Sequence, residues 1–286
     1  MTAPSLPLAG RAALVTGGGT GIGRASAEAL VADGASVTLV GRRADVLEAA
    51  AEEIGATAPE GAEVRWASAD VADEAQVQAA VATAAEGGGL DIAVLSAGTG
   101  TLGPITALPL EEWHRVVESN LTGTFLAMKH AANAMIATGR GGAIVAISSI
   151  AGVSSHRWMG PYCASKAGID MLVQVAADEL GRQGIRVCSV RPGVVQTDLG
   201  DHLIGVPDVL DDYLAQMPVS RVGHVDDVAA AVRYLCGPES SWVTGVALSV
   251  DGGMHVRRGP DLDSMARMLY GDEALDGRKP AILPDA

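Results

Sequence analysis

The sequence predicts an α/β protein: a doubly wound parallel sheet of about seven strands, with helices on both faces. Two observations support this fold class. Short apolar runs alternate along the chain with longer stretches of helical periodicity, and glycine is abundant while aromatic residues are scarce. Strands buried on both faces of a parallel sheet are rich in Val, Ile and Ala, and the turns of such a fold need glycine. The 286 residues suffice for one sizeable domain with a buried core.

The apolar runs give the expected strands, and the amphipathic stretches give the expected helices. The strands are Ala12–Thr16, Ser36–Val40, Glu63–Ala67, Ile92–Leu95, Ala143–Ile147, Arg186–Val190 and Ala247–Val250. The helices are Ile22–Asp33, Ala44–Ile54, Glu74–Ala85, Leu121–Ala137, Pro161–Arg182 and Val225–Cys236. We expect residues 11–253 to form one domain, since no repeat or Pro- or Ser-rich linker interrupts them, with a leader (1–10) and a C-terminal extension (254–286). Residues 199–222 are expected to form an inserted substrate loop.

Composition excludes several classes of partner and site. A formal charge of −14 repels nucleic acid and anionic membranes. No stretch reaches the roughly 18 apolar residues of a membrane helix, and residues 1–10 lack the regions of a secretion signal. Cys163, Cys188 and Cys236 are widely spaced, as expected for the reduced thiols of a cytoplasmic protein. No spacing of histidine with cysteine or carboxylate indicates a metal site.

A glycine-rich turn follows the first expected strand and leads directly into the first expected helix. Residues Thr16–Gly23 spell Thr-Gly-Gly-Gly-Thr-Gly-Ile-Gly. Glycines allow the backbone to approach a pyrophosphate closely, and the helix N-terminus offers unpaired N–H groups and the positive end of its dipole. This placement predicts a Rossmann-type dinucleotide site, although the spacing is not Gly-x-Gly-x-x-Gly. The residues expected at the cofactor are Gly17, Gly19, Thr20, Gly21, Ile22 and Gly23.

The end of the second expected strand favours NADP(H) over NAD(H). An acidic residue there would bind the ribose 2′-hydroxyl of NAD(H), but the strand is followed by Gly41, Arg42 and Arg43. Guanidinium groups suit bidentate contact with a 2′-phosphate, so NADP(H) is expected; in the alternative, NAD(H), the arginines only solvate a loop. After the third strand, Asp70 and Val71 are expected at the cofactor. Asp70 would accept a hydrogen bond from the adenine amine or, in the alternative, cap the next helix.

Tyr162 and Lys166 lie four residues apart at the start of a long helical pattern, and therefore on one helix face. A neighbouring ammonium favours the phenolate and lowers the phenol pKa, which makes tyrosine an effective acid–base catalyst. Ser149 follows the run Ala143–Ile147, and the carboxyl ends of parallel strands carry the ligand crevice. A serine there would donate a hydrogen bond to a carbonyl oxygen or orient Tyr162. The alternatives are an exposed helical pair and a serine that simply ends a strand.

These residues resemble the short-chain dehydrogenase/reductase family, in its shorter single-domain branch. The Thr-Gly-x-x-x-Gly-x-Gly turn, Asn120, Ser149 and the Tyr162–Lys166 pair stand in the family's order and spacing. Three further segments are similar to family motifs: Arg191–Gly193 continuing to Thr197, Arg221–Gly223, and Asp251–Gly253. One departure is Leu95–Gly98, which spells Leu-Ser-Ala-Gly where the family usually has Asn-Asn-Ala-Gly. The absence of the two asparagines puts in doubt a structural contact that they make in the family, rather than the catalytic chemistry.

The resemblance implies a role for each matching residue. Tyr162 would be the general acid in carbonyl reduction, or the base in alcohol oxidation. Lys166 would bind the nicotinamide ribose and lower the Tyr162 pKa, while Ser149 would hold the substrate oxygen. Asn120 would anchor a water molecule that relays protons to Lys166. The other cofactor contacts would be Ala97 and Gly98 on the adenosine side, and Pro192, Gly193, Val195 and Thr197 beside the nicotinamide.

Together, the residues and the resemblance predict an NADPH-dependent carbonyl reductase that acts on a hydrophobic secondary alcohol or ketone and assembles as a homotetramer. The substrate walls are expected from residues 99–104, 156–159 and 199–217, and their apolar candidates are Trp158, Met159, Leu203, Ile204 and Leu214. The alternatives are an NAD-dependent alcohol dehydrogenase, a non-catalytic NAD(P)-binding scaffold or regulator, and an epimerase or dehydratase of the same fold. The extension either frays or contains a docking helix, Leu262–Leu269.

Overall fold

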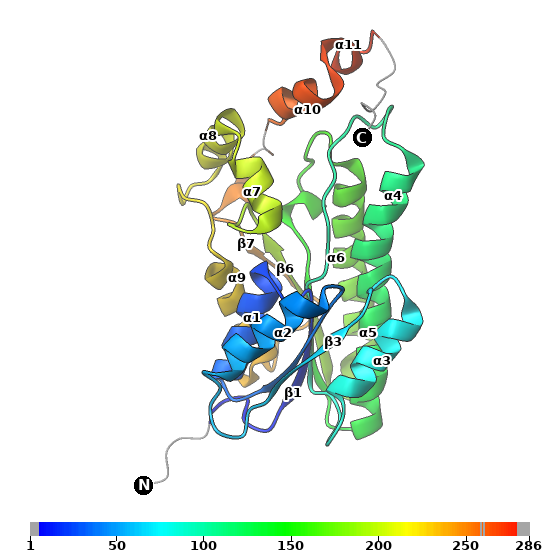
Figure 1. The fold of residues 1–286 in the computed structure, drawn as a ribbon, viewed down its shortest axis with the longest axis vertical. Coiled ribbons are helices and arrows are strands. Elements are labelled where there is room, and N and C mark those ends of the chain that lie inside the picture. The colour runs from blue at the N-terminus through cyan, green and yellow to red at the C-terminus, as the bar shows by residue number, and fades with distance from the viewer. Residues whose placement is uncertain (1–5, 258, 260, 279–286) are drawn as a thin grey trace.

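The computed structural model describes residues 6–257, 259 and 261–278, and it contains a seven-stranded parallel sheet (Figure 1). The strand order is β3-β2-β1-β4-β5-β6-β7. The strands are β1 (Ala12–Thr16), β2 (Ser36–Gly41), β3 (Val64–Ser68), β4 (Ile92–Leu95), β5 (Gly142–Ile147), β6 (Ile185–Pro192) and β7 (Ala247–Val250). The predicted fold class and all expected strands are confirmed, with small shifts at strand ends. Parts of the expected leader (1–5) and extension (258, 260 and 279–286) lie outside the described residues.

Helices cover both faces of the sheet (Figure 1). One face carries α1 (Gly21–Ala32), α2 (Ala44–Gly55) and α9 (Val225–Cys236). The other carries α3 (Glu74–Ala84), α4 (Leu110–Val117), α5 (Gly123–Thr138) and α6 (Gly160–Leu180). All expected helices are present, but the sequence analysis missed α4, although Pro109 and two glutamates in its first turn are ordinary helix-start signals. Within the described part of the chain, no helix is long and apolar enough to cross a membrane.

Alternation along the strands divides the core into two layers. In β1, Ala13 and Val15 pack among buried residues of α1, α2 and α9, whereas Leu14 packs on the opposite side among those of α3, α5 and α6. None of the three is more than 1% exposed. Because both faces of each central strand are covered, the strands are continuous apolar runs rather than alternating ones.

The strand order reverses at β1, which lies between β2 and β4. The chain leaves β1 into α1 on one face of the sheet, and it leaves β4 toward α4 on the other (Figure 1). The two connections therefore diverge, and a crevice opens beyond the carboxyl ends of the two strands. Open α/β sheets bind their ligands at this position.

Four short helices gather at the same end of the molecule (Figure 1). They are α7 (Asp198–Ile204), α8 (Pro207–Gln216), α10 (Asp263–Tyr270) and α11 (Asp272–Leu275). Residues 199–222, expected as an inserted loop, thus contain two helices. Beneath these helices lies a third buried apolar cluster, separate from the two sheet layers, which includes Met159, Val209, Met254 and Leu262.

Candidate active site

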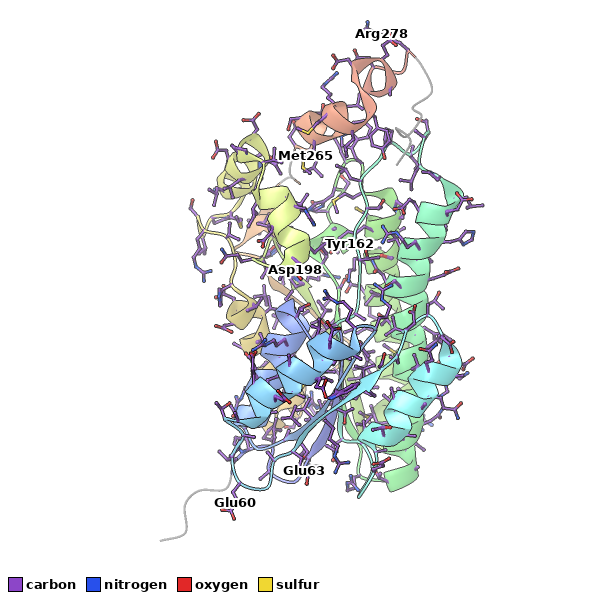
Figure 2. The ribbon with its side chains drawn as sticks, in the orientation of Figure 1. Glu60, Glu63, Tyr162, Asp198, Met265 and Arg278 are labelled. Atoms are coloured by element: carbon purple, nitrogen blue, oxygen red, sulfur yellow. The ribbon has the colours of Figure 1, made fainter. Side chains whose placement is uncertain are left out.

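A cavity of about 660 Å³ opens at the carboxyl ends of the strands, around Tyr162 and Asp198 (Figure 2). The predicted site residues that line it are Gly17, Thr20, Gly21, Ile22, Gly23, Ala97, Gly98, Ser149, Tyr162, Lys166, Pro192, Gly193, Val195 and Thr197. The predicted residues outside its lining are Gly19, Arg42, Arg43, Asp70, Val71 and Asn120. The fold therefore brings together residues from five separate segments of the chain, as a site at the carboxyl edge of a sheet requires.

The glycine-rich turn leaves space that side chains would fill. Gly17 has a φ of +66°, and a Cβ there would lie 3.0 Å from the Cα of Ala97. A Cβ at Gly23 would lie 2.2 Å from the carbonyl oxygen of Gly17. α1 begins at Gly21, and the side chain of its N-cap, Thr20, does not cap the helix. The first-turn N–H groups are thus left for a ligand, and the cradle fits the pyrophosphate of a nicotinamide dinucleotide.

Thr16 joins this turn to the end of β4. Its hydroxyl oxygen accepts hydrogen bonds from the backbone N–H groups of Ser96 (3.1 Å) and Ala97 (3.2 Å). Ser96 occupies one of the two positions where the family resemblance led us to expect asparagine. The link between the two loops is made by backbone donors, so it forms without that side chain.

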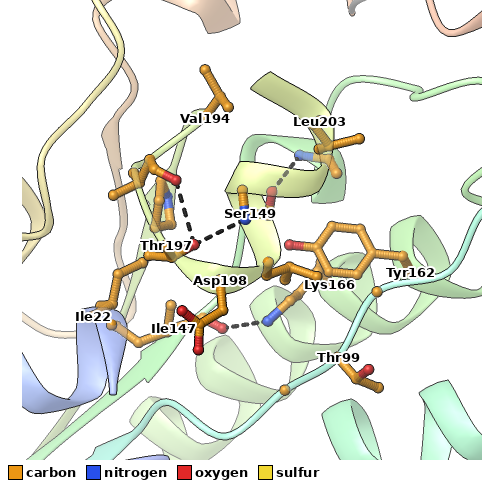
Figure 3. A pocket seen from close by; sticks show the side chains of 18 of the residues that line it. Ile22, Thr99, Ile147, Ser149, Tyr162, Lys166, Val194, Thr197, Asp198 and Leu203 are labelled. Carbon is orange, nitrogen blue, oxygen red and sulfur yellow. Dashed lines mark hydrogen bonds between the residues drawn. The ribbon is translucent and has the colours of Figure 1, made fainter. Parts of the chain in front are cut away.

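Ser149, Tyr162 and Lys166 meet at one wall of the cavity (Figure 3). Lys166 Nζ donates a hydrogen bond to the carbonyl oxygen of Ile147 (2.7 Å) and lies 5.6 Å from the centroid of the Tyr162 ring. Ser148 Oγ donates to the carbonyl oxygen of Lys166 (3.1 Å). These two bonds fix α6 against the end of β5, so the strand and the helix hold the three side chains in one arrangement.

Burial governs the ionisation of the tyrosine–lysine pair. It raises the pKa of Tyr162, an effect that a side-chain hydrogen bond with Ser149 only partly offsets. It also lowers the pKa of Lys166 to about 8, although the charge of Asp170 opposes this shift. The expected lowering of the Tyr162 pKa by Lys166 does not outweigh burial in the cofactor-free protein. The ammonium group donates to the carbonyl of Ile147, and desolvation of the phenolate dominates.

Asn120 is fully buried in a π-helical turn between α4 and α5. Its Oδ1 accepts a hydrogen bond from the N–H of Thr99 (2.8 Å), and its Nδ2 donates to the carbonyl of the same residue (2.9 Å). A Cβ at Gly98 would lie 3.2 Å from Asn120 Oδ1 and 3.7 Å from Lys166 Nζ, so both groups lie next to the space that the missing side chain of Gly98 leaves open. π-Helical turns are frequent at functional sites. The water relay stays a prediction.

The residues predicted for the adenosine end lie beyond the cavity lining. Arg42 and Arg43 are exposed, and within the described residues their guanidinium groups have no hydrogen bond or ion pair. Asp73 caps α3, so the capping role considered for Asp70 is wrong. The carboxylate of Asp70 instead accepts a hydrogen bond from the backbone N–H two residues on (3.0 Å). Val71, between β3 and α3, is buried against Gly123, the first residue of α5.

The substrate end of the cavity is largely apolar. Met159 and Leu203 line it as predicted, together with Leu102 from the loop after β4. Three predicted residues pack in the cluster beside the cavity rather than line it: Trp158, Ile204 and Leu214. Tyr213 also lines the cavity, within the wall predicted at 199–217, whereas Asp198 and Met265 line it outside the predicted wall segments. Nothing in the local pattern distinguishes Asp198 and Met265 from ordinary helical positions, because only the packing of α7 and α10 turns them toward the cavity.

Comparison with known proteins places the chain in a family. A family model described as enoyl-(acyl carrier protein) reductase matches residues 17–255. D-threitol dehydrogenase from Mycolicibacterium smegmatis is 39% identical over 253 residues, which cover 87% of this chain and 95% of the relative. The chain belongs to the short-chain dehydrogenase/reductase family. It is therefore an oxidoreductase that acts on CH–OH groups with a nicotinamide cofactor.

Solved structures of short-chain dehydrogenases/reductases share its fold. A short-chain type dehydrogenase/reductase from Mycobacterium ulcerans has 42% sequence identity and a TM-score of 0.91, with 95% of this chain and 99% of that one covered. Such coverage must include part of the C-terminal extension. 7α-Hydroxysteroid dehydrogenase, in complex with NADH and 7-oxo glycochenodeoxycholic acid, has 33% identity and a TM-score of 0.82, with 87% and 96% covered. Among residues 6–257, 259 and 261–278, no group of three or more His, Cys, Asp or Glu side chains could hold a metal ion.

We predict that Gly23→Ala weakens the binding of nicotinamide dinucleotides at least tenfold. The new Cβ would overlap the Gly17 carbonyl and displace the turn that faces the pyrophosphate. Calorimetric titration with NADPH and NADH measures the effect. Gly55→Ala is the matched control, because a Cβ at the end of α2 meets nothing within 4 Å. Equal affinities in the two variants would contradict the assignment of the turn.

We also predict that Tyr162 stays largely protonated at pH 10 in the cofactor-free protein. Its folded-state pKa is raised, so the phenolate forms at higher pH than in an ordinary tyrosine. The measurement is the phenolate absorbance of the wild type minus that of Tyr162→Phe, titrated from neutral to alkaline pH. A difference signal complete below pH 10 would show that the nearby ammonium, and not burial, governs the phenol.

Proposed function

We propose that this chain is an NADPH-dependent carbonyl reductase that converts a hydrophobic ketone to the secondary alcohol, with Tyr162 as general acid and base. The observation that supports it best is the meeting of Ser149, Tyr162 and Lys166 in the same cavity as the glycine-rich turn. Reduction of a ketone needs a hydride, which the reduced nicotinamide supplies when bound, and a proton, which the protein must supply. NAD-dependent oxidation of an alcohol at the same residues is the alternative.

Tyr162 is the proton donor in this proposal. Because burial raises its pKa, the phenol is protonated at neutral pH and available to a carbonyl oxygen. Ser149 Oγ accepts a hydrogen bond from the N–H of Ala151 (3.1 Å), which leaves its own hydrogen free for the same oxygen or for Tyr162. Lys166 donates one of its three protons to Ile147 and retains two for ribose hydroxyls or the phenol. A protonated phenol favours the reductive direction.

The preference for NADPH rests on Arg42 and Arg43. Both stand at the end of β2, where a carboxylate would bind the ribose of NAD(H), and both are exposed with free guanidinium groups within the described chain. A Cβ at Gly19 would lie 3.1 Å from Val46 on α2, so the glycine-rich turn lies against the helix that starts directly after the arginines. A 2′-phosphate near this turn would therefore meet positive charge.

The substrate proposal rests on the lining of the cavity. Leu102, Met159 and Leu203 contribute hydrocarbon and thioether groups to the cavity that Tyr162 lines, beside the polar side chains of His156 and His202. The relatives described above are named for D-threitol and for a 7α-hydroxysteroid, a polyol and a large apolar skeleton. Apolar walls favour the second kind of substrate. Burial of a hydrocarbon skeleton against them is favourable, whereas the additional hydroxyl groups of a polyol would find no hydrogen-bond partners on them.

We further propose a homotetramer in the cytoplasm. Apolar side chains on the outer surfaces of α5 and α6 are unusually exposed in a single chain: Phe125 is 46%, Met171 is 59% and Val175 is 47% exposed. Such a surface is typical of an interface between subunits. Cys163, Cys188 and Cys236 are all free thiols, which suits a reducing compartment.

We predict that the protein binds NADPH at least tenfold more tightly than NADH, a difference of about 1.4 kcal/mol. The double variant Arg42→Ala/Arg43→Ala should lose that preference through weaker NADPH binding, while its NADH affinity stays the same. Calorimetric titration with each cofactor measures this. Arg182→Ala, which removes an exposed arginine just beyond the end of α6, is the control. A wild type that prefers NADH would refute the assignment and favour the dehydrogenase alternative.

We predict that Tyr162→Phe lowers kcat for ketone reduction by about 10²- to 10⁴-fold, the usual contribution of a general acid. Cofactor affinity should stay within about threefold of the wild type, because the phenyl ring remains in place. The assay is NADPH oxidation with a panel of cyclic ketones, with product analysis to exclude epimerisation or dehydration. A wild type that binds cofactor but turns over none of them would support the non-catalytic scaffold.

A further inference from the structure

Helix α10 of the C-terminal extension lies across the substrate end of the cavity. Met265 lines the cavity, and Figure 2 shows it on α10, above Tyr162 and Asp198 in this view. Leu262 and Ala266 are fully buried, and Leu262 belongs to the same apolar cluster as Met159. The described part of the extension is therefore packed on its own chain rather than frayed.

The sequence of α10 suits this position. Leu262, Met265 and Ala266 have the spacing of one helix face, and that face is turned toward the apolar cluster. Met268, on the other side of the helix, is 76% exposed. The helix is therefore amphipathic, and the side chain that it presents to the cavity is the long and flexible Met265.

Polar contacts attach α10 to the walls of the cavity. Tyr270 Oη donates a hydrogen bond to the carbonyl oxygen of Leu102 (2.8 Å), in the loop after β4. The N–H of Asp261 donates to a carboxylate oxygen of Asp212 on α8 (2.5 Å). Two separate segments of the cavity rim thus hold the extension from opposite ends of the helix.

Asp263 attaches the helix to the segment that precedes the catalytic helix α6. Its carboxylate accepts a hydrogen bond from Trp158 Nε1 (3.3 Å) and forms an ion pair with Arg157, whose guanidinium also lies 4.9 Å from the centroid of the Trp158 ring. Trp158 has a φ of +71°, and it is the one non-glycine residue in the described chain with a positive φ. Its carbonyl accepts a hydrogen bond from the N–H of Gly103 (2.7 Å). Strain of this kind persists only where surrounding contacts impose it.

We propose that α10 closes the substrate end of the active site and that Met265 determines which substrates fit, a role that rests on the proposed function. Met265 lines the same cavity as Leu102 and Leu203, and Tyr270 attaches the helix to the loop that carries Leu102, so a substrate group that extends from Tyr162 toward α10 meets Met265. The flexible methionine side chain can pack against apolar groups of different shapes and so favours their burial. The enzyme therefore selects secondary alcohols and ketones whose distal part is hydrocarbon, and shortening Met265 admits larger ones.

The test compares Met265→Ala with Met268→Ala, which makes the same change on the exposed side of the same helix. We expect Met265→Ala to raise, at least tenfold, the ratio of kcat/KM for 4-tert-butylcyclohexanol to that for cyclohexanol. Met268→Ala should leave the ratio within twofold of the wild type. Cofactor affinity should not change in either variant. Equal ratios in the two variants would overturn the role of Met265.

A second measurement does not depend on turnover. Asp263→Asn weakens the contact with Arg157, so we expect hydrogen exchange of the α10 amides to become at least tenfold faster. The same substitution at Asp178, an exposed position on α6, should leave α10 within twofold of the wild type. Unchanged exchange in Asp263→Asn would refute the attachment of α10. A wild type that turns over no ketone or alcohol would defeat the proposed function, while the exchange result would still decide whether α10 is held over the cavity.

Discussion

The site depends on the close approach of two backbones at the carboxyl ends of β1 and β4. These strands lie side by side, but their connections leave toward opposite faces of the sheet, so the loops separate and leave a crevice. At the base of the crevice, Gly17 lies so near Ala97 that a Cβ would be only 3.0 Å from its Cα. The hydroxyl oxygen of Thr16 joins the two loops, because it accepts hydrogen bonds from the backbone N–H groups of Ser96 and Ala97. Without this contact, the first turn of α1 would not face the cavity.

The catalytic wall depends on a different junction, between β5 and α6. One hydrogen bond runs from Lys166 Nζ to the end of the strand, and another runs from Ser148 to the backbone of the helix. The junction buries Lys166 and partly buries Tyr162, which lowers the pKa of the ammonium and raises that of the phenol. In the proposed ketone reduction, this desolvation keeps Tyr162 in the protonated form that can donate to the carbonyl oxygen.

The apolar third cluster connects these junctions to the extension. Met159, next to the start of α6, shares that cluster with residues of α8 and with Leu262 beside α10. Trp158 adds a polar connection, because its carbonyl binds the loop after β4 and its indole binds Asp263. The walls of the substrate space therefore support one another, although they come from the middle and the end of the chain.

The sequence by itself determined the sheet, the helices on its faces, the family and the choice of Ser149, Tyr162 and Lys166 as the proposed catalytic residues. Those features are local: the periodicity of a strand or helix, or residue types at fixed spacing, which one stretch of chain records. Tertiary structure alone decided the direction of the Tyr162 pKa shift, the position of Asn120 beside Gly98, and the presence of Asp198 and Met265 in the cavity lining. The burial of a residue and its place in a cavity depend on contacts between segments that are distant in sequence. A helix such as α10 shows its apolar face in its own residues, but only packing decides what that face covers.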